Sequence, residues 1–260
     1  MKELCQKELK KVQLDILQAV HEFCAKNKIG YYLTYGTLIG AIRHNGYIPW
    51  DDDIDICMAR PDYEKFLRFF GDGRYEVVSF DKDQRFLFSF AKVIDNNTVL
   101  IEESGINYKM GINIDIFPID GIDDDTALLK WQILLHKLVD FKVVRLSLSR
   151  SLFKNLVLLA GKMLLCVIPL SVLIRSMTKN AIKHDYDSAK KVCCVAFGSK
   201  YNQPIDKTIF EKGVLWQFES KQFYVPAGYD QYLKSVFGDY MKLPPIEKRV
   251  THHKFRAYYK

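Results

Sequence analysis

The stretch PWDDDIDICM, residues 49–58, places four carboxylates within five positions: Asp51, Asp52, Asp53 and Asp55. The alternation of Asp53 and Asp55 with isoleucines predicts a half-buried strand that carries both carboxylates on one face. Neighbouring carboxylates repel each other and raise each other's pKa unless a cation lies between them. The run therefore predicts a metal site. A solvated acidic turn is the alternative, and the apolar opposite face of the strand favours the metal site.

A single carboxylate lies on a second predicted strand, GINIDIFPID, residues 111–120. In this strand Ile112, Ile114 and Ile116 face one way, and Asn113, Asp115 and Phe117 face the other. Burying a lone carboxylate is costly unless it has a partner. We therefore expect Asp115 to complete a metal site with Asp53 and Asp55. A salt-bridged or helix-capping aspartate is the alternative.

A possible phosphate contact precedes the acidic run. A short predicted strand at residues 31–35 leads to Gly36 and Thr37, which open a helical run that ends at Gly46. The backbone N–H groups at the start of such a helix can bind phosphate. Gly36 lies 17 residues before Asp53, so the two can meet across neighbouring strands.

The remaining sequence predicts an α+β fold. Helical periodicity marks residues 3–27 and 61–70, and β-branched and aromatic residues mark strands at 75–80, 86–94 and 98–103. A long helix is predicted to begin at three capping aspartates, residues 123–125, and further helices extend to about residue 191. A strand at 218–226 and a helix at 229–238 follow. We expect a catalytic core at 1–122, a basic helical segment at 123–192, and a C-terminal part at 193–260 that completes the catalytic domain.

Charge is unevenly distributed along the chain. The net charge is +7, but residues 130–200 carry 13 Lys or Arg against 3 Asp or Glu, a local charge of +10 that leaves −3 for the rest. This segment predicts contact with something anionic, such as phosphates, a glycolipid or the surface of a membrane. The solvated face of basic helices is the alternative. We expect no nucleic-acid partner.

Further features of the sequence indicate the cellular compartment. The most hydrophobic run, residues 164–174, has 11 residues and contains Pro169, so it is shorter than the roughly 20 residues of a spanning helix. The N-terminus is charged, unlike a signal peptide, and the six cysteines show no C-x-x-C spacing, which indicates buried thiols in a reducing compartment. We expect a cytoplasmic protein that can act at the inner face of the membrane.

Three carboxylates from two strands beside a glycine turn are suited to metal-dependent phosphoryl transfer. Mg²⁺ prefers oxygen ligands and binds through a few carboxylates and substrate phosphates, and Mn²⁺ is an alternative. The pattern of glycine with a small hydroxyl residue, then Asp-x-Asp, then a third Asp on a later strand resembles the nucleotidyltransferase superfamily. That resemblance implies a mixed sheet with packed helices, to which the basic helical segment is an addition.

A closer resemblance lies in two strings. YGTLIGAIRHNGYIPWDDDIDI, residues 35–56, and YMKLPPIEKRVTHH, residues 240–253, are similar to the signature and the C-terminal motif of the LicD family of phosphocholine transferases. The resemblance implies transfer of phosphocholine, or a related phospho-substituent, from CDP-choline or another CDP-linked donor, with Mg²⁺ and release of CMP. The implied acceptor is a hydroxyl of a glycan or glycolipid such as lipopolysaccharide, teichoic acid or capsule.

The resemblance also implies roles for individual residues. Asp53 and Asp55 would bind the metal, and Asp115 would be a third ligand or the base that takes the proton of the acceptor hydroxyl. The donor phosphates would be contacted by Gly36, Thr37, Arg43, Lys248 and Arg249.

Some roles and classes stay open at this point. Tyr47 and Trp50 are the nearest aromatic candidates for a quaternary ammonium group, with core packing as the alternative. His252 and His253 are either solvated or close to a phosphate. A glycosyltransferase-like enzyme that uses Asp-x-Asp to hold a nucleotide sugar, and a non-catalytic protein with this fold, are the other functional classes.

Overall fold

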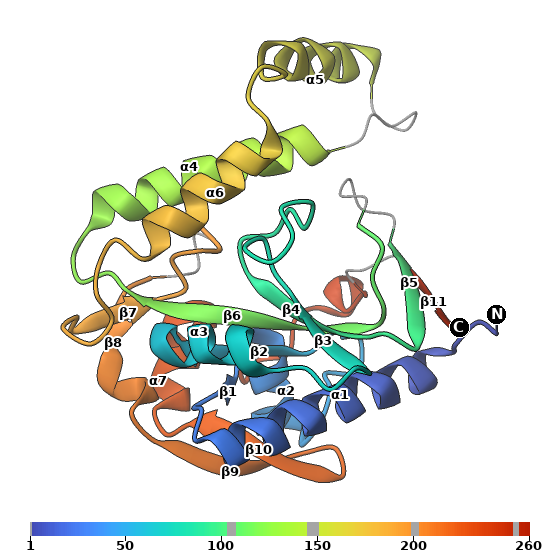
Figure 1. The fold of residues 1–260 in the computed structure, drawn as a ribbon, viewed down its shortest axis with the longest axis vertical. Coiled ribbons are helices and arrows are strands. Elements are labelled where there is room, and N and C mark those ends of the chain that lie inside the picture. Colours follow the sequence, from blue (N-terminus) through green and yellow to red (C-terminus); the bar gives the residue numbers. More distant parts are fainter. Residues whose placement is uncertain (1, 103–107, 145–150, 199–202, 252–254) are drawn as a thin grey trace.

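The computed structural model describes residues 2–102, 108–144, 151–198, 203–251 and 255–260. Its centre is a mixed sheet with the strand order β1-β2-β6-β4-β3 (Figure 1). Strands β2 and β6 are parallel, and the other neighbours in this order are antiparallel. The bounds are β1 Tyr32–Leu33, β2 Asp55–Ala59, β3 Tyr75–Val78, β4 Ala91–Asp95 and β6 Asn113–Gly121. The predicted α+β class with a mixed sheet is confirmed.

Three helices from the first third of the chain pack on this sheet. They are α1 (Gln6–Asn27), α2 (Tyr35–His44) and α3 (Arg60–Phe69), and they match the predicted helical runs. Phe23 of α1 packs edge-on against Phe66 and Phe70, which lie in and just after α3. The isoleucine face of β6 is buried in the same core. The apolar periodicity of these helices therefore serves to cover the sheet.

The structure corrects several predicted strands. Strand β4 begins only at Ala91, so residues 86–90 of the predicted strand at 86–94 do not belong to a β-strand. Strand β5 (Thr98–Glu102) pairs with β11 (Phe255–Tyr259) from the C-terminus and not with the main sheet. The predicted strand at 218–226 is β10 (Lys221–Pro226) with the turn before it, where Glu219 has a positive φ of 56°, and β10 pairs in a hairpin with β9 (Gly213–Phe218). Helix α7 (Tyr229–Phe237) is where the sequence predicts it.

The helical segment contains α4 (Thr126–Val143), α5 (Leu152–Leu164) and α6 (Leu170–Ala181). Asp125 caps α4 as predicted, accepting the N–H of Leu128 at 2.9 Å. The predicted third helix ends at Ala181 instead of near residue 191, because the chain returns to the sheet as β7 (Lys191–Cys193), which pairs with β6, and β8 (Ile205–Asp206) pairs with β7. Asp123 does more than charge the helix start: its carboxylate accepts the N–H groups of Lys190 and Lys191 at this return.

Helices α4 and α6 share a small core of their own. It is made of Phe80, Leu135, Val139, Leu173, Ile174 and Met177. Figure 1 shows α4 and α6 side by side above the sheet, with α5 beyond them at one end of the long axis. Among the helices in the described part of the chain, none combines the length and the apolar character needed to cross a membrane.

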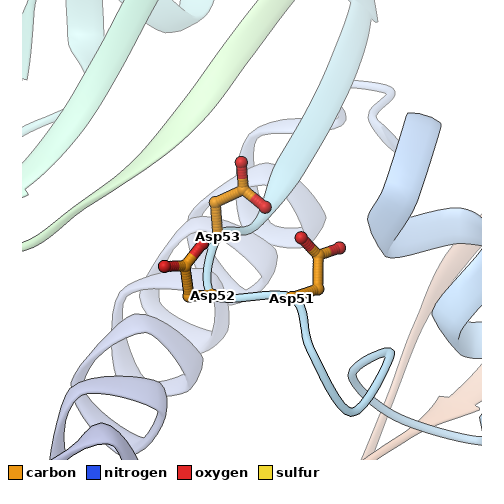
Figure 2. A group of neighbouring side chains, drawn as sticks. All are labelled: Asp51, Asp52 and Asp53. Atoms are coloured by element: carbon orange, nitrogen blue, oxygen red, sulfur yellow. The ribbon is translucent and has the colours of Figure 1, made fainter. Parts of the chain in front are cut away.

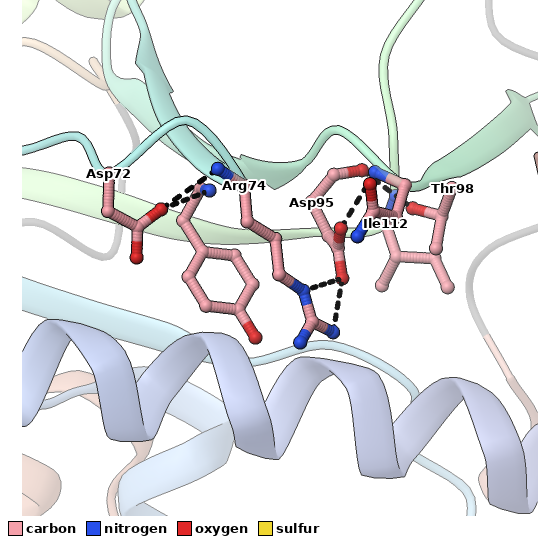
Figure 3. A network of polar contacts seen from close by, with 7 residues as sticks. Asp72, Arg74, Asp95, Thr98 and Ile112 are labelled. Atoms are coloured by element: carbon pink, nitrogen blue, oxygen red, sulfur yellow. Dashed lines mark hydrogen bonds and ion pairs between the residues drawn. The ribbon is translucent and has the colours of Figure 1, made fainter.

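A polar network fixes the start of β6, the strand that carries Asp115 (Figure 3). The buried carboxylate of Asp95 accepts from Arg74 at 2.9 Å. The hydroxyl of Thr98 donates to the carbonyl oxygen of Asp95 at 2.9 Å and accepts from the N–H of Ile112 at 2.8 Å. Gly111 is required here, since a Cβ on it would lie 2.0 Å from that same carbonyl oxygen. The turns around β3, β4 and β5 thus hold the entry to β6 in one position.

All six cysteines are free thiols, as the lack of paired spacing predicts. Four of them, Cys24, Cys57, Cys193 and Cys194, are buried, and Cys5 and Cys166 are exposed. Burial raises the pKa of the Cys194 thiol to about 12, so it stays protonated near neutral pH.

Candidate active site

The start of α2 is fastened to the start of β2 by the backbone of Asp55. Its N–H donates to the hydroxyl of Thr37 at 2.8 Å, and its carbonyl oxygen accepts from the N–H of Thr34 at 3.0 Å. Between them, Tyr35 takes a positive φ of 44°, which makes the turn from β1 into α2 tight. The first turn of α2 is therefore held beside the acidic strand, as the spacing of Gly36 and Asp53 predicts.

Gly36 lies against the carboxylate of Asp51. A Cβ at this position would come within 2.7 Å of an Asp51 carboxylate oxygen, so a larger residue would displace it. Thr37 is buried, and its hydroxyl serves the backbone of Asp55. These contacts give both residues a role in positioning the acidic run. Their predicted contact with donor phosphates stays a prediction.

Sheet register brings the two predicted acidic strands together. Asp55 of β2 and Asp115 of β6 are partners across the parallel pair, and Asp115 is also opposite Lys92 of β4. Partners in register point to the same face of a sheet. The amine of Lys92 bonds the Asp115 carboxylate and donates to the side-chain oxygen of Asn113 at 3.1 Å. Lys92 thus adds one positive charge to a face that carries several negative ones.

The turn before β2 holds a second group of carboxylates. Asp51, Asp52 and Asp53 each offer an oxygen within 4.8 Å of the others. Figure 2 shows them on the segment that leads into β2, where the carboxylates of Asp51 and Asp53 extend in the same direction. Asp52 is buried, and its carbonyl oxygen accepts from the side chain of Gln13 on α1 at 2.9 Å. Asp53 belongs to the group on the turn, and its charge also acts on Asp55 at the start of β2.

Charge repulsion is strong in this group. Burial, followed by the charge of Asp53, raises the pKa of Asp51 to about 8. Burial, followed by the charges of Asp53 and Asp115, raises the pKa of Asp55 well above its ordinary value, and Lys92 opposes that shift only in part. A cation close to these oxygens would remove the repulsion.

The residues present fit a hard divalent cation. Asp51, Asp52 and Asp53 on the turn form a group of possible ligands that offers only carboxylate oxygens, and among the described residues this group includes neither Asp55 nor Asp115. Such an oxygen-only set suits Mg²⁺ or Mn²⁺ better than zinc. Which carboxylates bind directly stays a prediction, and Asp51, with an oxygen within 4.8 Å of oxygens of Asp52 and Asp53, lies close enough to be one.

Arg43 and Arg249 belong to two distant segments that contact each other next to the acidic turn. The side chain of Arg43, at the end of α2, donates to the carbonyl oxygen of Tyr240 at 2.5 Å and to the ring of His44 at 3.0 Å. Arg249 lies over the ring of Trp50, 5.5 Å from its centroid. The ring of His44 packs edge-on against Trp50, so Arg43 and Arg249 contact neighbouring rings. Burial, and then the charge of Arg249, lowers the pKa of Arg43. The C-terminal motif is thus folded back to the first signature string.

The other predicted phosphate and aromatic residues have mixed placements. Lys248 is exposed in a short 3₁₀ turn, Ile246–Lys248, beside Arg249. Tyr47 is buried, and the amine of Lys10 lies 4.5 Å from the centroid of its ring. Tyr47 therefore packs in the core. Trp50 already carries Arg249. His252 and His253 lie outside the described residues.

Sequence reasoning missed two lysines of the site. Lys92 follows Phe88 and Phe90 at alternate positions, so a strand would place all three on one face. A charged residue in this otherwise aromatic series could have indicated a site residue. Lys10 on α1 had no such signal, because the helix carries many lysines. Burial lowers its pKa, while the carboxylates of Asp51 and its neighbours oppose this shift.

A pocket opens beside the carboxylates. Asp52, Asp53, Lys92 and Asp115 line one part of it. Leu9, Leu100 and Phe255 provide apolar wall from α1 and the β5–β11 pair. A molecule held there would place a polar end at the carboxylates and an apolar part against the C-terminal strand.

Several known proteins are similar to this chain in sequence. A family model described as LicD/FKTN/FKRP, nucleotidyltransferase domain, matches residues 28–150. A protein of Haemophilus influenzae, named lipopolysaccharide cholinephosphotransferase LicD, is 31% identical over 99% of this chain and 99% of its own length. An uncharacterized protein of Rickettsia prowazekii is 47% identical over 18% of each chain.

Proposed function

The chain belongs to the LicD family, and on that premise we propose that it transfers phosphocholine, or a related substituted phosphate, from a CDP-linked donor to a cell-surface glycan. The similarity to the Haemophilus cholinephosphotransferase runs over nearly the whole of both chains, so it includes the acidic turn, both strands and the C-terminal motif. This supports a phosphotransferase over a nucleotide-sugar transferase or a non-catalytic binder.

One observation carries the proposal: Asp55 and Asp115 lie in register on neighbouring strands, and the guanidinium group of Arg249 lies over the ring of Trp50, the residue that precedes the acidic turn. A nucleoside diphosphate ester has a pyrophosphate that needs positive charge on both sides. We assign one side to the metal held by Asp53 and Asp55. We assign the other side to Arg43 and Arg249, whose planar groups suit phosphate oxygens.

The remaining residues orient the reacting groups. The metal, when bound, would stabilise charge on the phosphoryl oxygens during in-line displacement. Asp115 would be a third ligand or would accept the proton of the acceptor hydroxyl, and Lys92 holds its carboxylate in place for either role. Thr37 keeps Asp55 at the start of β2.

The proposal also covers the identity of the donor and of the acceptor. CDP-choline is the preferred donor, because the Haemophilus relative is named for phosphocholine transfer, and CDP-glycerol and CDP-ribitol are alternatives. Lipopolysaccharide is the acceptor in that relative's name, and teichoic acid and capsule are alternatives. We place the reaction in the cytoplasm, at the inner face of the membrane.

The test is CMP release by purified wild type, Asp53→Asn and Asp55→Asn, with lipopolysaccharide as acceptor and Mg²⁺, Mn²⁺ or EDTA. We expect both variants and the EDTA sample to lose at least about 100-fold in rate, because each loses charge that organises the phosphates. Asp239→Asn, a change to an exposed carboxylate elsewhere, is the matched control and should keep wild-type turnover. Turnover at the wild-type rate in Asp53→Asn or Asp55→Asn would contradict the assignment.

The same assay separates the functional classes. A panel of CDP-choline, CDP-glycerol, CDP-ribitol and a UDP-sugar identifies the donor from the nucleotide released. Steady sugar transfer without reaction from any CDP-linked donor would show the glycosyltransferase class instead. Equal circular dichroism spectra for all variants would show that lost activity is not lost folding.

A further inference from the structure

Helix α5 presents an apolar face to the outside of the molecule. Phe153 is 74% exposed, Leu156 64%, Val157 54% and Met163 67%, and Val167 just after the helix is 79% exposed. Residues three, four, seven and ten positions apart lie on the same side of a helix. These side chains therefore form one outward stripe. A contiguous apolar patch on the surface of a protein marks a site of interaction with another molecule or a membrane.

Two described lysines, Lys142 of α4 and Lys162 of α5, satisfy carbonyl groups where these two helices meet. The amine of Lys142, near the end of α4, donates to the carbonyl oxygen of Leu165 at 2.5 Å. The amine of Lys162 on α5 donates to the carbonyl oxygen of Lys142 at 2.8 Å. Both lysines thus satisfy carbonyl groups at the ends of helices. Packing between these helices also involves Gly161, where a Cβ would lie 2.5 Å from the ring of Phe141.

This arrangement differs from that of an ordinary surface helix. A helix on a water-exposed surface turns its apolar stripe to the core and its charges to the solvent. Here Leu158 is buried against the protein, yet most of the exposed positions of α5 are apolar as well. The helix is therefore apolar on the side that faces away from the molecule, which suits an apolar environment there.

Charge and position identify the kind of partner. Residues 130–200 carry a net +10, whereas the rest of the chain carries −3, so an anionic surface would attract this end of the molecule and repel the other. Figure 1 shows α5 at one extreme of the long axis, separated from the sheet by α4 and α6. An apolar stripe on a basic segment is the pattern of a helix that lies in the plane of a membrane.

We propose that α5 binds the surface of an anionic phospholipid bilayer, with Phe153, Leu156, Val157 and Met163 inserted among the lipids. The 13 residues of α5 are about 20 Å long, shorter than the roughly 30 Å hydrocarbon core, so the helix lies in the interface and does not cross it. This inference names the surface at which the proposed transfer takes place, and it stands even if the transferred group is a different one.

The test is flotation of the purified protein with vesicles of phosphatidylethanolamine and phosphatidylglycerol, compared with vesicles of phosphatidylcholine alone. The double variant Leu156→Glu, Met163→Glu places two charges in the stripe and should lower the partition coefficient on anionic vesicles by at least about tenfold. Phe69→Glu is the matched control, because Phe69 is 63% exposed on α3 in the body of the protein, and it should bind like wild type. Raised salt should weaken but not abolish wild-type binding.

Several outcomes would overturn the inference. Wild type that stays unbound on anionic vesicles, or a double variant that floats like wild type, removes the bilayer as partner. A wild-type dimer that the double variant converts to a monomer, seen by sedimentation, would assign the stripe to a second copy of the chain. CMP release with a water-soluble acceptor, measured on the same samples, tests the proposed function separately, because that reaction needs no vesicle.

Discussion

Replacing Asp51 by asparagine should stabilise the metal-free protein, and the gain should depend on pH. The pKa of Asp51 is raised from 3.8 to about 8 by burial and by Asp53. Below pH 4 the carboxyl is protonated in both the folded and the unfolded chain, so the replacement changes little. Between pH 4 and pH 8 the unfolded chain releases a proton that the folded chain retains, and folding stability falls as the pH rises. Above pH 8 the full destabilisation is present.

The size of the effect follows from the shift. A change of about 4 pKa units corresponds to at most about 6 kcal/mol. Asp51 is only half-buried, so solvent screens part of the repulsion and we expect about 2 kcal/mol. For a chain of this length that is a rise in Tm of roughly 4–8 °C. Asparagine has the same shape, so the close approach to Gly36 is preserved.

The measurement is thermal unfolding in EDTA at pH 4, 7 and 9, for wild type, Asp51→Asn and the exposed control Asp239→Asn. The difference in Tm between Asp51→Asn and wild type should grow across this range, while the control stays level. Added Mg²⁺ should stabilise wild type more than Asp51→Asn, because a bound cation relieves repulsion that the variant lacks. A difference independent of pH, or a variant less stable than wild type at pH 9 without metal, would refute the reasoning.

Three further predictions concern neighbouring contacts. Thr37→Val should lower the free energy of unfolding in urea by about 1–3 kcal/mol, because the N–H of Asp55 loses its acceptor, whereas Thr37→Ser should stay near wild type. Asp120→Ala leaves Arg60 without its buried partner at 2.6 Å and should cost about 3–5 kcal/mol; a loss in urea unfolding below about 1 kcal/mol would count against that pair. Arg249→Lys should raise KM for the CDP-linked donor with little change in kcat, since lysine keeps the charge but not the planar group, and an unchanged KM would remove this residue from the donor site.

Local pattern was enough for the elements and for much of the site. The apolar spacing of residues 3–27 gave α1, and Pro61 and the aspartate at 125 marked true helix starts. The alternation in the acidic run placed Asp55 on a half-buried strand, and the strings at 35–56 and 240–253 indicated the family that the comparison shows. Such features depend on neighbours within a few positions, so periodicity and propensity can report them.

Errors arose where pairing partners are far apart in sequence. The alternation in residues 98–103 marked a strand, but only the folded chain shows that β5 pairs with β11 from the C-terminus. A separate, local error is that the strand predicted at 218–226 begins before β10 and runs through the turn at Glu219, which has no glycine or proline signal. Residues 182–190, expected to be helical, lead instead to the pairing of β7 with β6.

By itself the sequence placed Asp55 and Asp115 on strands and indicated the family, but it also placed Asp53 on the first strand, whereas β2 begins at Asp55 and Asp53 lies on the turn before it. Only the tertiary structure decided that Asp55 stands in register with Asp115, that Lys92 is opposite Asp115, and that Arg249 folds back over Trp50 beside the acidic turn. The physical reason is range: side-chain parity is set by the backbone within two residues, whereas register and the approach of distant segments are set by hydrogen bonding and packing of the whole sheet.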